Sequence, residues 1–541
     1  MALAAGTVLS GLGVGLSPIV GEVYRVSPLA QLPARAKHAG DSEQEKQSLR
    51  SAISNVASDL DHLMTKVDET SVEIFEALKM LLEDEDLFET AVSEIETGWN
   101  AGSAFEIAVE TFGELLAGDA AFEERVADLR DLARRVHASV FGIKVGLDIP
   151  TTGKFILVGD DFSPADTAQF TDAVIGVVTI KGGPTSHTAI ICRSRSIPAV
   201  VSCAQAKDLS NGERVLVDPV GDRVVVGGDV SLATQSIEFV AKSSEPIIPV
   251  RANIGSLEDA IAAAATAAHG VGLFRTELLY LSSSAAPSLE TQAKNYSEIL
   301  AAAPEGPLVV RTIDAGSDKP VPFLNMPHEE NPALGVRGYR LILDHRNFIE
   351  DQLKSLEIAR HQTGREVWVM APMISTSTEA IEFAELARSL GNFKVGVMVE
   401  TPSIAAVISD LAGKLDFISV GTNDLSQYLF AADRMNAALG TLLNPWQPAL
   451  IRTLANIASE SEKAGLSSGV CGESASDPAF AVVLAGLGFK SVSSSRSQVG
   501  AVRSALSAVT MEQAQAVAAA VLKQDSAEAT KATALSELAS L

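Results

Sequence analysis

Residues 394–424 read KVGVMVETPSIAAVISDLAGKLDFISVGTND, and this stretch holds two short apolar runs with a helical stretch between them. The runs KVGVMVE and DFISVGT are rich in β-branched residues, which is typical of buried parallel strands. Each run ends in polar residues, because Glu400 closes the first and Asn423 with Asp424 follows the second. This strand–helix–strand unit with polar strand ends is the pattern that decides the fold of the chain.

Eight such apolar runs follow one another from about residue 248 onward, with helical stretches between them. They are IPVRANI, VGLFR, LVVRTI, VWVMAPM, KVGVMVE, DFISVGT, SSGVCGE and FKSVSSS. Eight strands that alternate with helices predict a (β/α)8 TIM-type barrel, which we place at residues 248–541. Because such barrels carry their active sites at the carboxyl ends of the strands, the polar residues found there are candidates for chemistry.

The strand ends and the loops behind them hold four arginines, two carboxylates, an amide and a thiol. These residues are Arg275, Arg311, Arg337, Arg434, Glu400, Asp424, Asn423 and Cys471. Several guanidinium groups can clamp a small polyanion by forked hydrogen bonds, although any single arginine could equally be a surface ion-pair partner. Glu400 and Asp424 are hard oxygen ligands that suit Mg²⁺ held partly by a substrate phosphate, to which Asn423 could donate. Cys471 suits either a small core residue or an acid that protonates a carbanion.

Ahead of the barrel, residues 181–200 read KGGPTSHTAIICRSRSIPAV and place one histidine at the predicted start of a helix. Gly182 and Gly183 allow backbone angles that other residues avoid, and a helix N-terminus favours negative charge. His187 is therefore a candidate phosphate acceptor, because a neutral imidazole nitrogen is a competent nucleophile. An isolated histidine is more often structural, so the rest of the chain has to decide between the two interpretations.

The part of the chain before the barrel divides into a β-rich and a helical region. Short β-branched runs between residues 145 and 230 predict a compact α/β domain that carries His187, and the segment SPIVGEVYRV suits the same sheet. Apolar residues spaced three and four apart within residues 41–141 predict a helical bundle inserted into that domain. We place the α/β domain at residues 1–30 and 142–230, the inserted bundle at 31–141 and a linker at 231–247.

Charge and cysteine content limit the partners and the compartment. The 541 residues carry a formal net charge of −26, which argues against nucleic acid as a partner. Three cysteines without a CxxC pair indicate a reducing compartment and no structural zinc. The sequence offers no long apolar run for a membrane span, and its apolar first residues suit a strand better than a signal peptide, so we expect a cytoplasmic protein. The acidic faces of the helical bundle suit either a solvated surface or a docking face for a basic partner.

The candidates at the strand ends fit one kind of chemistry when they are taken together. A metal ion and arginines would neutralise phosphate charge while the phosphoryl group leaves a small carboxylated substrate, and an acid would quench the carbon left behind. Cys471 suits the role of the acid, and His187 suits the role of the acceptor of the phosphoryl group.

Six stretches of the chain match the motifs of one family. They read GGPTSHTAIICRSRSIPAV, GVGLFRTELLYL, VVRTIDAGSDKPVPFLNMPHEENPALGVRGYRL, VGVMVETPSIA, ISVGTNDLSQYLFAADR and GVCGESASDP. Together they closely resemble Enzyme I of the bacterial phosphoenolpyruvate:sugar phosphotransferase system, from roughly residue 8 to the end and in the family's domain order. The barrel motifs are shared with pyruvate phosphate dikinase and phosphoenolpyruvate synthase, but those enzymes carry a large ATP-binding domain for which this chain has no room.

The resemblance implies that His187 receives the phosphoryl group of phosphoenolpyruvate on Mg²⁺ and passes it to a histidine of the carrier protein HPr, which docks on the helical insertion. It implies substrate binding by Arg275, Arg311, Asn423, Asp424 and Arg434, to which the loop residue Arg337 adds a further candidate. It also implies that Glu400 and Asp424 bind the metal and that Cys471 protonates the enolate to pyruvate. Because the family dimerises through its barrel, we expect a homodimer.

The chain departs from the family pattern at few positions. Thr401 stands beside Glu400 where the family often has an aliphatic residue, and SVSSSRSQVG at the last strand is less regular than usual. Two alternatives are open: an enzyme of the same barrel group with a different phosphoryl acceptor, and a non-catalytic regulator that binds HPr and senses phosphoenolpyruvate. The matched Glu400, Asp424 and Cys471 argue against the regulator, because a sensor needs no proton donor.

Overall fold

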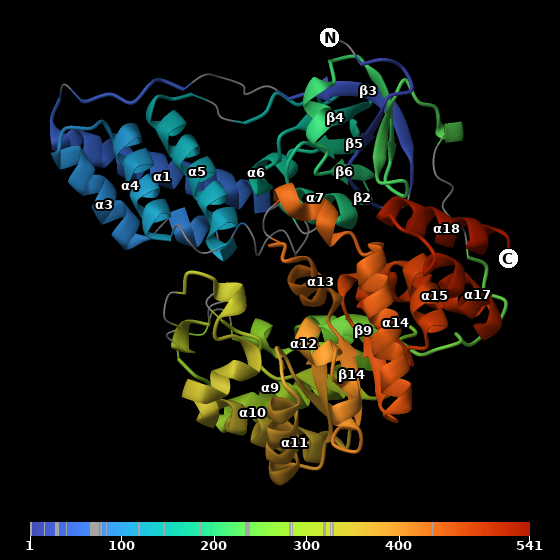
Figure 1. Cartoon of the computed structure of the whole chain (residues 1–541). Coiled ribbons are helices and arrows are strands. Elements are labelled where there is room, and N and C mark those ends of the chain that lie inside the picture. Colours follow the sequence, from blue (N-terminus) through green and yellow to red (C-terminus); the bar gives the residue numbers. More distant parts are fainter. Residues whose placement is uncertain are drawn as a thin grey trace. The chain divides into compact units, whose positions relative to one another are not determined.

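The structure is a computed structural model, shown in Figure 1. It describes the chain except residues 1–2, 16, 27–31, 39, 65–74, 76–77, 83, 117–119, 144–145, 184–185, 196, 233–238, 281–282, 284, 317–320, 325, 327–328 and 435–436. The chain forms two compact units. We call them the N-terminal unit, Met1–Ser236 with Met435–Thr441, and the barrel unit, Ile237–Arg434 with Leu442–Leu541.

An eight-stranded sheet in the order β1-β8-β7-β3-β4-β5-β6-β2 forms the centre of the N-terminal unit. Its strands are β1 Val8–Ser10, β2 Leu12–Val14, β3 Ile19–Arg25, β4 Phe155–Gly159, β5 Val174–Thr179, β6 Ala199–Val201, β7 Arg214–Asp218 and β8 Arg223–Val226. The four strands β3 to β6 run parallel, and β3 lies between β4 and β7. The N-terminal segment SPIVGEVYRV therefore joins the sheet formed by the later runs, as the sequence indicates.

A hydrophobic core lies on each face of this sheet. Successive side chains along a strand point to opposite sides, so one strand can contribute to both cores. On β4, Ile156 and Val158 pack into one hydrophobic core, while Phe155 and Leu157 pack into another. Two helices follow the parallel strands: α6, Pro164–Thr167, begins with a capping box, and α7 spans His187–Ser194. The side chain of Ser186 caps α7 by accepting a hydrogen bond from Ala189 N at 3.4 Å.

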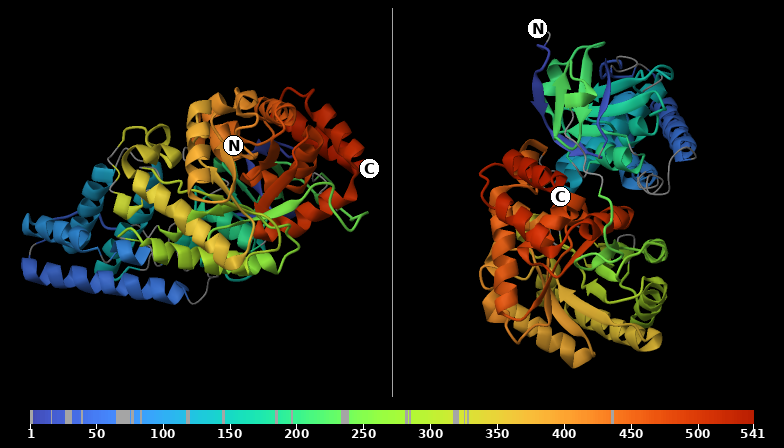
Figure 2. Two further views of the ribbon diagram at one scale, coloured as in Figure 1. Left: turned by 90° about the horizontal axis from the view of Figure 1, so that it is seen from below. Right: turned by 90° about the vertical axis from the view of Figure 1, so that its right-hand side faces the viewer.

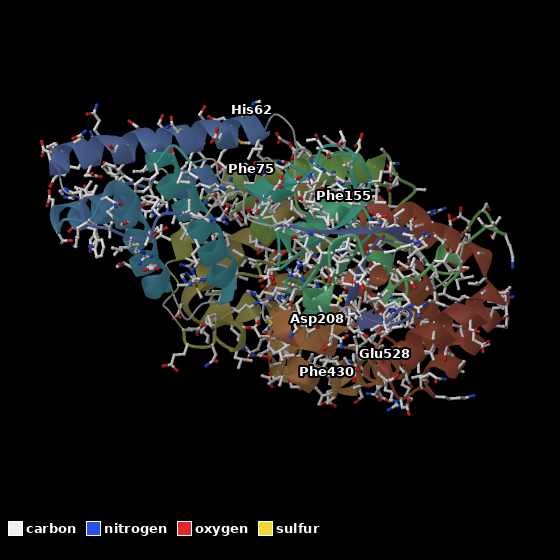
Figure 3. The ribbon with its side chains drawn as sticks, turned by 90° about the horizontal axis from the view of Figure 1, so that it is seen from above. His62, Phe75, Phe155, Asp208, Phe430 and Glu528 are labelled. Carbon is white, nitrogen blue, oxygen red and sulfur yellow. The ribbon has the colours of Figure 1, made fainter. Side chains whose placement is uncertain are left out.

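Among the described residues, the bundle between β3 and β4 contains the helices α1 Ser42–Met64, α3 Glu85–Glu96, α4 Ala101–Leu116 and α5 Ala120–Val140. The predicted apolar stripe of α1 buries Leu49, Val56 and Leu60. Phe75, which is labelled in Figure 3, belongs to the same core. Val67, which continues the apolar spacing of α1, lies outside the described residues, as do residues 74, 76 and 77 of the apolar segment 74–82. Leu78 and Leu82 of that segment are described and belong to the same core.

Helix α3 lies within the predicted helical bundle, but its bounds were not predicted, because its acid-rich start was interpreted as a solvated surface or a docking face. Its N-cap, Asp84, accepts a hydrogen bond from Leu87 N at 3.0 Å. Leu87, Ala91 and Ile95 are spaced four apart and are buried in the bundle. The acidic first turn is thus the capped start of an amphipathic helix.

The barrel unit contains the predicted closed barrel of eight parallel strands (Figure 2). The strands are β9 Val250–Ile254, β10 Val271–Arg275, β11 Leu308–Arg311, β12 Val367–Ala371, β13 Lys394–Val399, β14 Phe417–Val420, β15 Ser467–Val470 and β16 Ser491–Ser495. Each corresponds to one of the eight apolar runs. The barrel closes where β16 pairs with β9, with Val492 opposite Val250.

The helices of this unit are α8 Leu257–Ala264, α9 Leu289–Ala302, α10 Ile342–Thr363, α11 Ser377–Leu390, α12 Pro402–Ala405, α13 Thr422–Phe430, α14 Pro448–Lys463, α15 Pro478–Leu487, α16 Val499–Ala508, α17 Met511–Val521 and α18 Ala527–Ala539. Side chains alternate along β12, so Val367 and Val369 pack in the main core while Trp368 and Met370 belong to a separate cluster with Cys471. Across the described parts of the chain, we find no helix with both the length and the apolar character needed to cross a membrane.

Candidate active site

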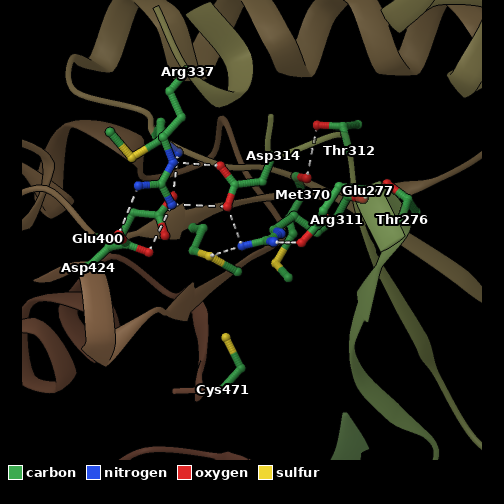
Figure 4. Close-up of polar contacts among 12 residues, drawn as sticks. Thr276, Glu277, Arg311, Thr312, Asp314, Arg337, Met370, Glu400, Asp424 and Cys471 are labelled. Atoms are coloured by element: carbon green, nitrogen blue, oxygen red, sulfur yellow. Dashed lines mark hydrogen bonds and ion pairs between the residues drawn. The ribbon is translucent and has the colours of Figure 1, made fainter. Parts of the chain in front are cut away.

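Arg337 lies at the centre of the polar groups that collect at the carboxyl ends of the barrel strands (Figure 4). Its guanidinium is fully buried and donates two hydrogen bonds to Asp314, at 3.0 and 3.1 Å, and two to Asp424, at the same distances. Four of its five N–H donors are therefore used by carboxylates on two sides. A direct role of Arg337 in substrate binding, which the sequence suggested, would require this clamp to open.

Arg311, the last residue of β11, is the second buried cation of the site and is 5% exposed. One of its terminal nitrogens, Nη1, lies 2.9 Å from Asp314, and the other bonds Glu277. Burial opposes the charge of Arg311, but Asp314 and Glu277 outweigh this and hold its pKa above the ordinary value. The buried atoms Arg311 Nε and Glu277 Oε2 have no hydrogen-bond partner among the described residues.

Glu400 follows β13 and is fully buried. Its Oε1 accepts a hydrogen bond from Met373 N at 2.5 Å, whereas Oε2 has no partner among the described residues. Burial, reinforced by Asp424 and Asp314, raises the pKa of Glu400 to about 7. Met373 holds its N–H toward Glu400 with a left-handed φ of 57°, a strained backbone of the kind that clusters at functional sites.

Asp424, Asn423 and Arg434 come from α13 and the loop behind it. Both carboxylate oxygens of Asp424 accept from Arg337, and Arg434 Nη1 lies 3.5 Å from one of them. The side-chain oxygen of Asn423 accepts from Glu473 N at 3.0 Å. The amide NH₂ of Asn423 makes no hydrogen bond to a described residue, so its donors are available.

Cys471 directly follows β15, and its side chain is buried with Sγ 3.5 Å from Val420 O. Burial raises the pKa of the thiol, and the opposing effects of Ser419, Arg311 and Arg275 are smaller. The thiol is thus held in its protonated form at neutral pH. Arg275 ends β10 and makes no hydrogen bond or ion pair to a described residue, which leaves its guanidinium available.

A buried polar network behind the site fixes the end of β11. Gln352 of α10 accepts from Ile313 N at 2.9 Å and donates to Thr276 Oγ1 and Tyr296 OH, both at 3.0 Å. Thr276 in turn donates to the carbonyl of Arg311 at 2.8 Å. Glu277, Asp314 and Gln352 were not among the site residues predicted from the sequence. The first two follow strand ends inside the quoted motifs and could have been found there, whereas Gln352 lies within a helix and carries no such signal.

The segment of the proposed phosphate acceptor belongs to the N-terminal unit. Residues 184–185 and the imidazole of His187 lie outside the described part of the structure. Next to them, Thr188 donates to Asp161 Oδ1 at 2.6 Å, which ties the start of α7 to the loop after β4. Gly182 has a φ of +80°, and a Cβ there would lie 2.8 Å from Asp161, so this turn requires glycine.

The residues around Glu400 fit a divalent cation. Glu400 and Asp424 are buried carboxylates at the ends of neighbouring strands, and Glu400 Oε2 is a buried oxygen without a partner among the described residues. The described residues contain no group of three or more His, Cys, Asp or Glu side chains placed to hold a metal. The carboxylates of Glu400 and Asp424 suit Mg²⁺, which commonly uses one or two carboxylates and takes its other ligands from substrate phosphate and water.

Comparison with known proteins gives matches along nearly the whole chain. Family models described as the PEP-binding, mobile and N-terminal domains of PEP-utilising enzymes match residues 234–511, 151–220 and 10–125. A phosphoenolpyruvate-protein phosphotransferase of Streptomyces coelicolor is 39% identical, with 96% of this chain and 97% of the relative covered. Proteins of the same name from Geobacillus stearothermophilus and Bacillus subtilis are 32% and 31% identical; both alignments cover 96% of this chain, and they cover 96% and 98% of the relatives.

Proposed function

Because the chain belongs to the phosphoenolpyruvate-protein phosphotransferase family, Enzyme I of the phosphotransferase system, we propose that it moves the phosphoryl group of phosphoenolpyruvate to His187 and then to HPr, releasing pyruvate. The observation that carries this proposal is the convergence of Arg311, Glu400 and Cys471 at the carboxyl ends of three barrel strands. A cation, a metal-ligating carboxylate and a protonated thiol are the groups that this reaction needs.

Substrate binding uses the donors that the barrel leaves available. The guanidinium of Arg275, the NH₂ group of Asn423 and the partly exposed Arg434 suit the phosphate and carboxylate of phosphoenolpyruvate. Arg311 stays charged in its buried place, and its unpartnered Nε offers a further donor. Arg337 positions Asp424 rather than the substrate.

Glu400 and Asp424 would hold Mg²⁺, with the phosphate of the substrate as a further ligand. The ion would supply charge neutralisation on the phosphoryl group as it leaves. A carboxylic acid with a pKa near 7 binds a cation only after it loses its proton, so Glu400 makes metal binding weaken below neutral pH.

The thiol of Cys471 serves as the acid that completes pyruvate. When the P–O bond breaks, the phosphoryl group forms a P–N bond with a ring nitrogen of His187, and the electron pair stays on the enolate. The methylene carbon of the enolate then takes the proton from Cys471 Sγ, and the resulting thiolate regains a proton from water. Burial keeps the thiol protonated until this strong carbon base is formed.

HPr docks on the helical bundle, and the acidic surface of α3 supports this part of the proposal. Asp84, Glu85 and Asp86 are exposed side by side at the start of the helix and would attract a basic partner. We also propose a homodimer through the barrel unit, where Leu334 and Leu343 are exposed. A cytoplasmic location is supported by Cys192, Cys203 and Cys471, which are all free thiols.

The test is to incubate the chain with phosphoenolpyruvate and Mg²⁺, and to measure pyruvate release and phosphate transfer to HPr or to ADP. We expect pyruvate and phosphorylated HPr, and no ATP. Formation of ATP without phosphorylated HPr would favour another enzyme of the same barrel group. Binding of phosphoenolpyruvate without pyruvate release would favour a regulator and contradict the proposal.

A further inference from the structure

Arg251, the second residue of β9, lies at the opposite end of the barrel from the candidate active site. Its guanidinium lies 5.0 Å from the centre of the Trp368 ring, but it makes no hydrogen bond or ion pair to a described residue. Its Nε is buried without a partner. Arg251 as a whole is only partly buried, but a buried donor without a partner is costly, so its Nε calls for an acceptor that the described residues do not supply.

Arg251 lines a small cavity among the amino-terminal ends of the strands, which we call the barrel-floor cavity. Its other polar lining residues include Trp368, Ser419, Ser467, Ser491 and Ser493. Ser493 donates to Asn253 at 2.6 Å, whereas Ser491 makes no hydrogen bond to a described residue. The volume of about 10 Å³ holds one small ion or one water molecule.

Two glycines keep this floor open and polar. A side chain at Gly272 would approach the Cβ of Arg251 to 3.1 Å and collide with Ser493, and one at Gly469 would lie 2.8 Å from Ser491 Oγ. Most barrels of this type fill the same space with bulky branched side chains. Here Gly272, Gly469 and several serines lie beside bulky residues such as Trp368 and Phe417, so the space next to the guanidinium is only partly filled.

The charge around the cavity is positive, in contrast to the chain's net charge of −26. Glu366 acts on Arg251 only from a distance. It is already bound by Lys394 Nζ at 2.9 Å and by the indole N–H of Trp368 at 2.8 Å. Lys394 also lies 4.6 Å from the centre of the Trp368 ring, so two cations share this one carboxylate.

We propose that the barrel-floor cavity binds a monovalent anion of halide size, with Arg251 as its charge partner and the hydroxyl of Ser491 as a hydrogen-bond donor. A water molecule would also fit the space but carries no charge to balance that of Arg251. Binding to the folded barrel alone would stabilise it by mass action. This inference does not depend on the phosphoryl-transfer reaction.

Bromide is a suitable probe, because it quenches indole fluorescence and Trp368 lines the cavity. We would titrate the full chain with sodium bromide, holding ionic strength constant with gluconate, which is too large to enter. A saturable quenching component is expected in the native chain. It should be lost in Arg251→Met and in Trp368→Phe, but kept in Arg388→Met, whose arginine pairs with Asp416 on the outside of the barrel.

Arg251→Met should fold, since it removes an uncompensated charge, and in gluconate its barrel should be at least as stable as the native one. Equal, non-saturable quenching of the native chain and of Arg251→Met would show water only and overturn the proposal. If Arg251→Met fails to fold, crystals of the native chain soaked in bromide decide the question. An anomalous peak beside Arg251 supports the site, and its absence contradicts it.

Discussion

Replacing Asp314 by asparagine tests the proposed organisation of the site most sharply, because this fully buried carboxylate contacts both central arginines. Removing one partner of a buried ion pair costs about 3–5 kcal/mol, since it leaves the other charge uncompensated. Arg337 keeps Asp424 and Arg311 keeps Glu277, so we expect the lower end, about 3 kcal/mol. Turnover of phosphoenolpyruvate should fall as well, because Arg311 loses one of its two anchors.

The assay is urea unfolding of the full chain in a Trp99→Phe background, so that Trp368 and Trp446 report on the barrel unit. Glu350→Gln is the matched control, because it breaks a surface pair with Arg346 on α10 that spans 2.8 Å. Such an exposed pair contributes about 0.5 kcal/mol. If Asp314→Asn cost no more than this control and turned over substrate normally, the inferred role of the buried carboxylate would be wrong.

Three further predictions concern the metal, the acid and the docking face. The pKa of Glu400 is raised from 4.5 to about 7 in the folded chain, so without metal its contribution to stability is present below pH 4.5 and is lost as pH rises through about 7. Mg²⁺ should therefore stabilise the barrel unit more at pH 8 than at pH 6 in thermal unfolding, and Glu400→Gln should abolish that difference; an unchanged difference would refute the assignment. Cys471→Ser should lower the rate of pyruvate formation at least tenfold while changing phosphoenolpyruvate affinity little, because a proton donor acts chiefly in the transition state; a variant with full turnover would make Cys471 a packing residue. Glu85→Lys combined with Asp86→Lys should slow phosphate exchange with HPr several-fold, most strongly at low salt, without slowing pyruvate release. Exchange at the native rate would place the docking site elsewhere.

Much of the fold could be predicted because most barrel strands are short apolar runs separated by helical stretches, and several of these runs end in polar residues. That regularity located Arg275, Arg311, Glu400, Asn423 and Cys471 at strand ends before any coordinates were known. The bounds of helix α3 were not predicted, because an acidic first turn precedes its sparse apolar stripe of Leu87, Ala91 and Ile95. A stripe with one apolar residue per turn is a weak signal beside a run of charges.

The organisation of the site was less accessible, because it depends on which side chains meet across strands. Nothing local in the sequence indicates that the guanidinium of Arg337 donates its hydrogen bonds to Asp314 and Asp424 and not to a substrate. The same holds for Gln352, whose importance lies in contacts to residues 39 and 76 positions away in sequence. Charge and residue type identify candidates, but burial decides whether they bind ligand or hold one another.

Whether His187 is the phosphoryl acceptor is decided by identifying the phosphorylated residue after a single incubation of the full chain with labelled phosphoenolpyruvate and Mg²⁺. We expect one phosphate on His187, stable in base and labile in acid as a phosphoramidate is, with one pyruvate released for each phosphate bound. His187→Ala should fold normally and carry no label. Label on a serine or aspartate, or pyruvate released without any phosphorylated protein, would contradict this assignment.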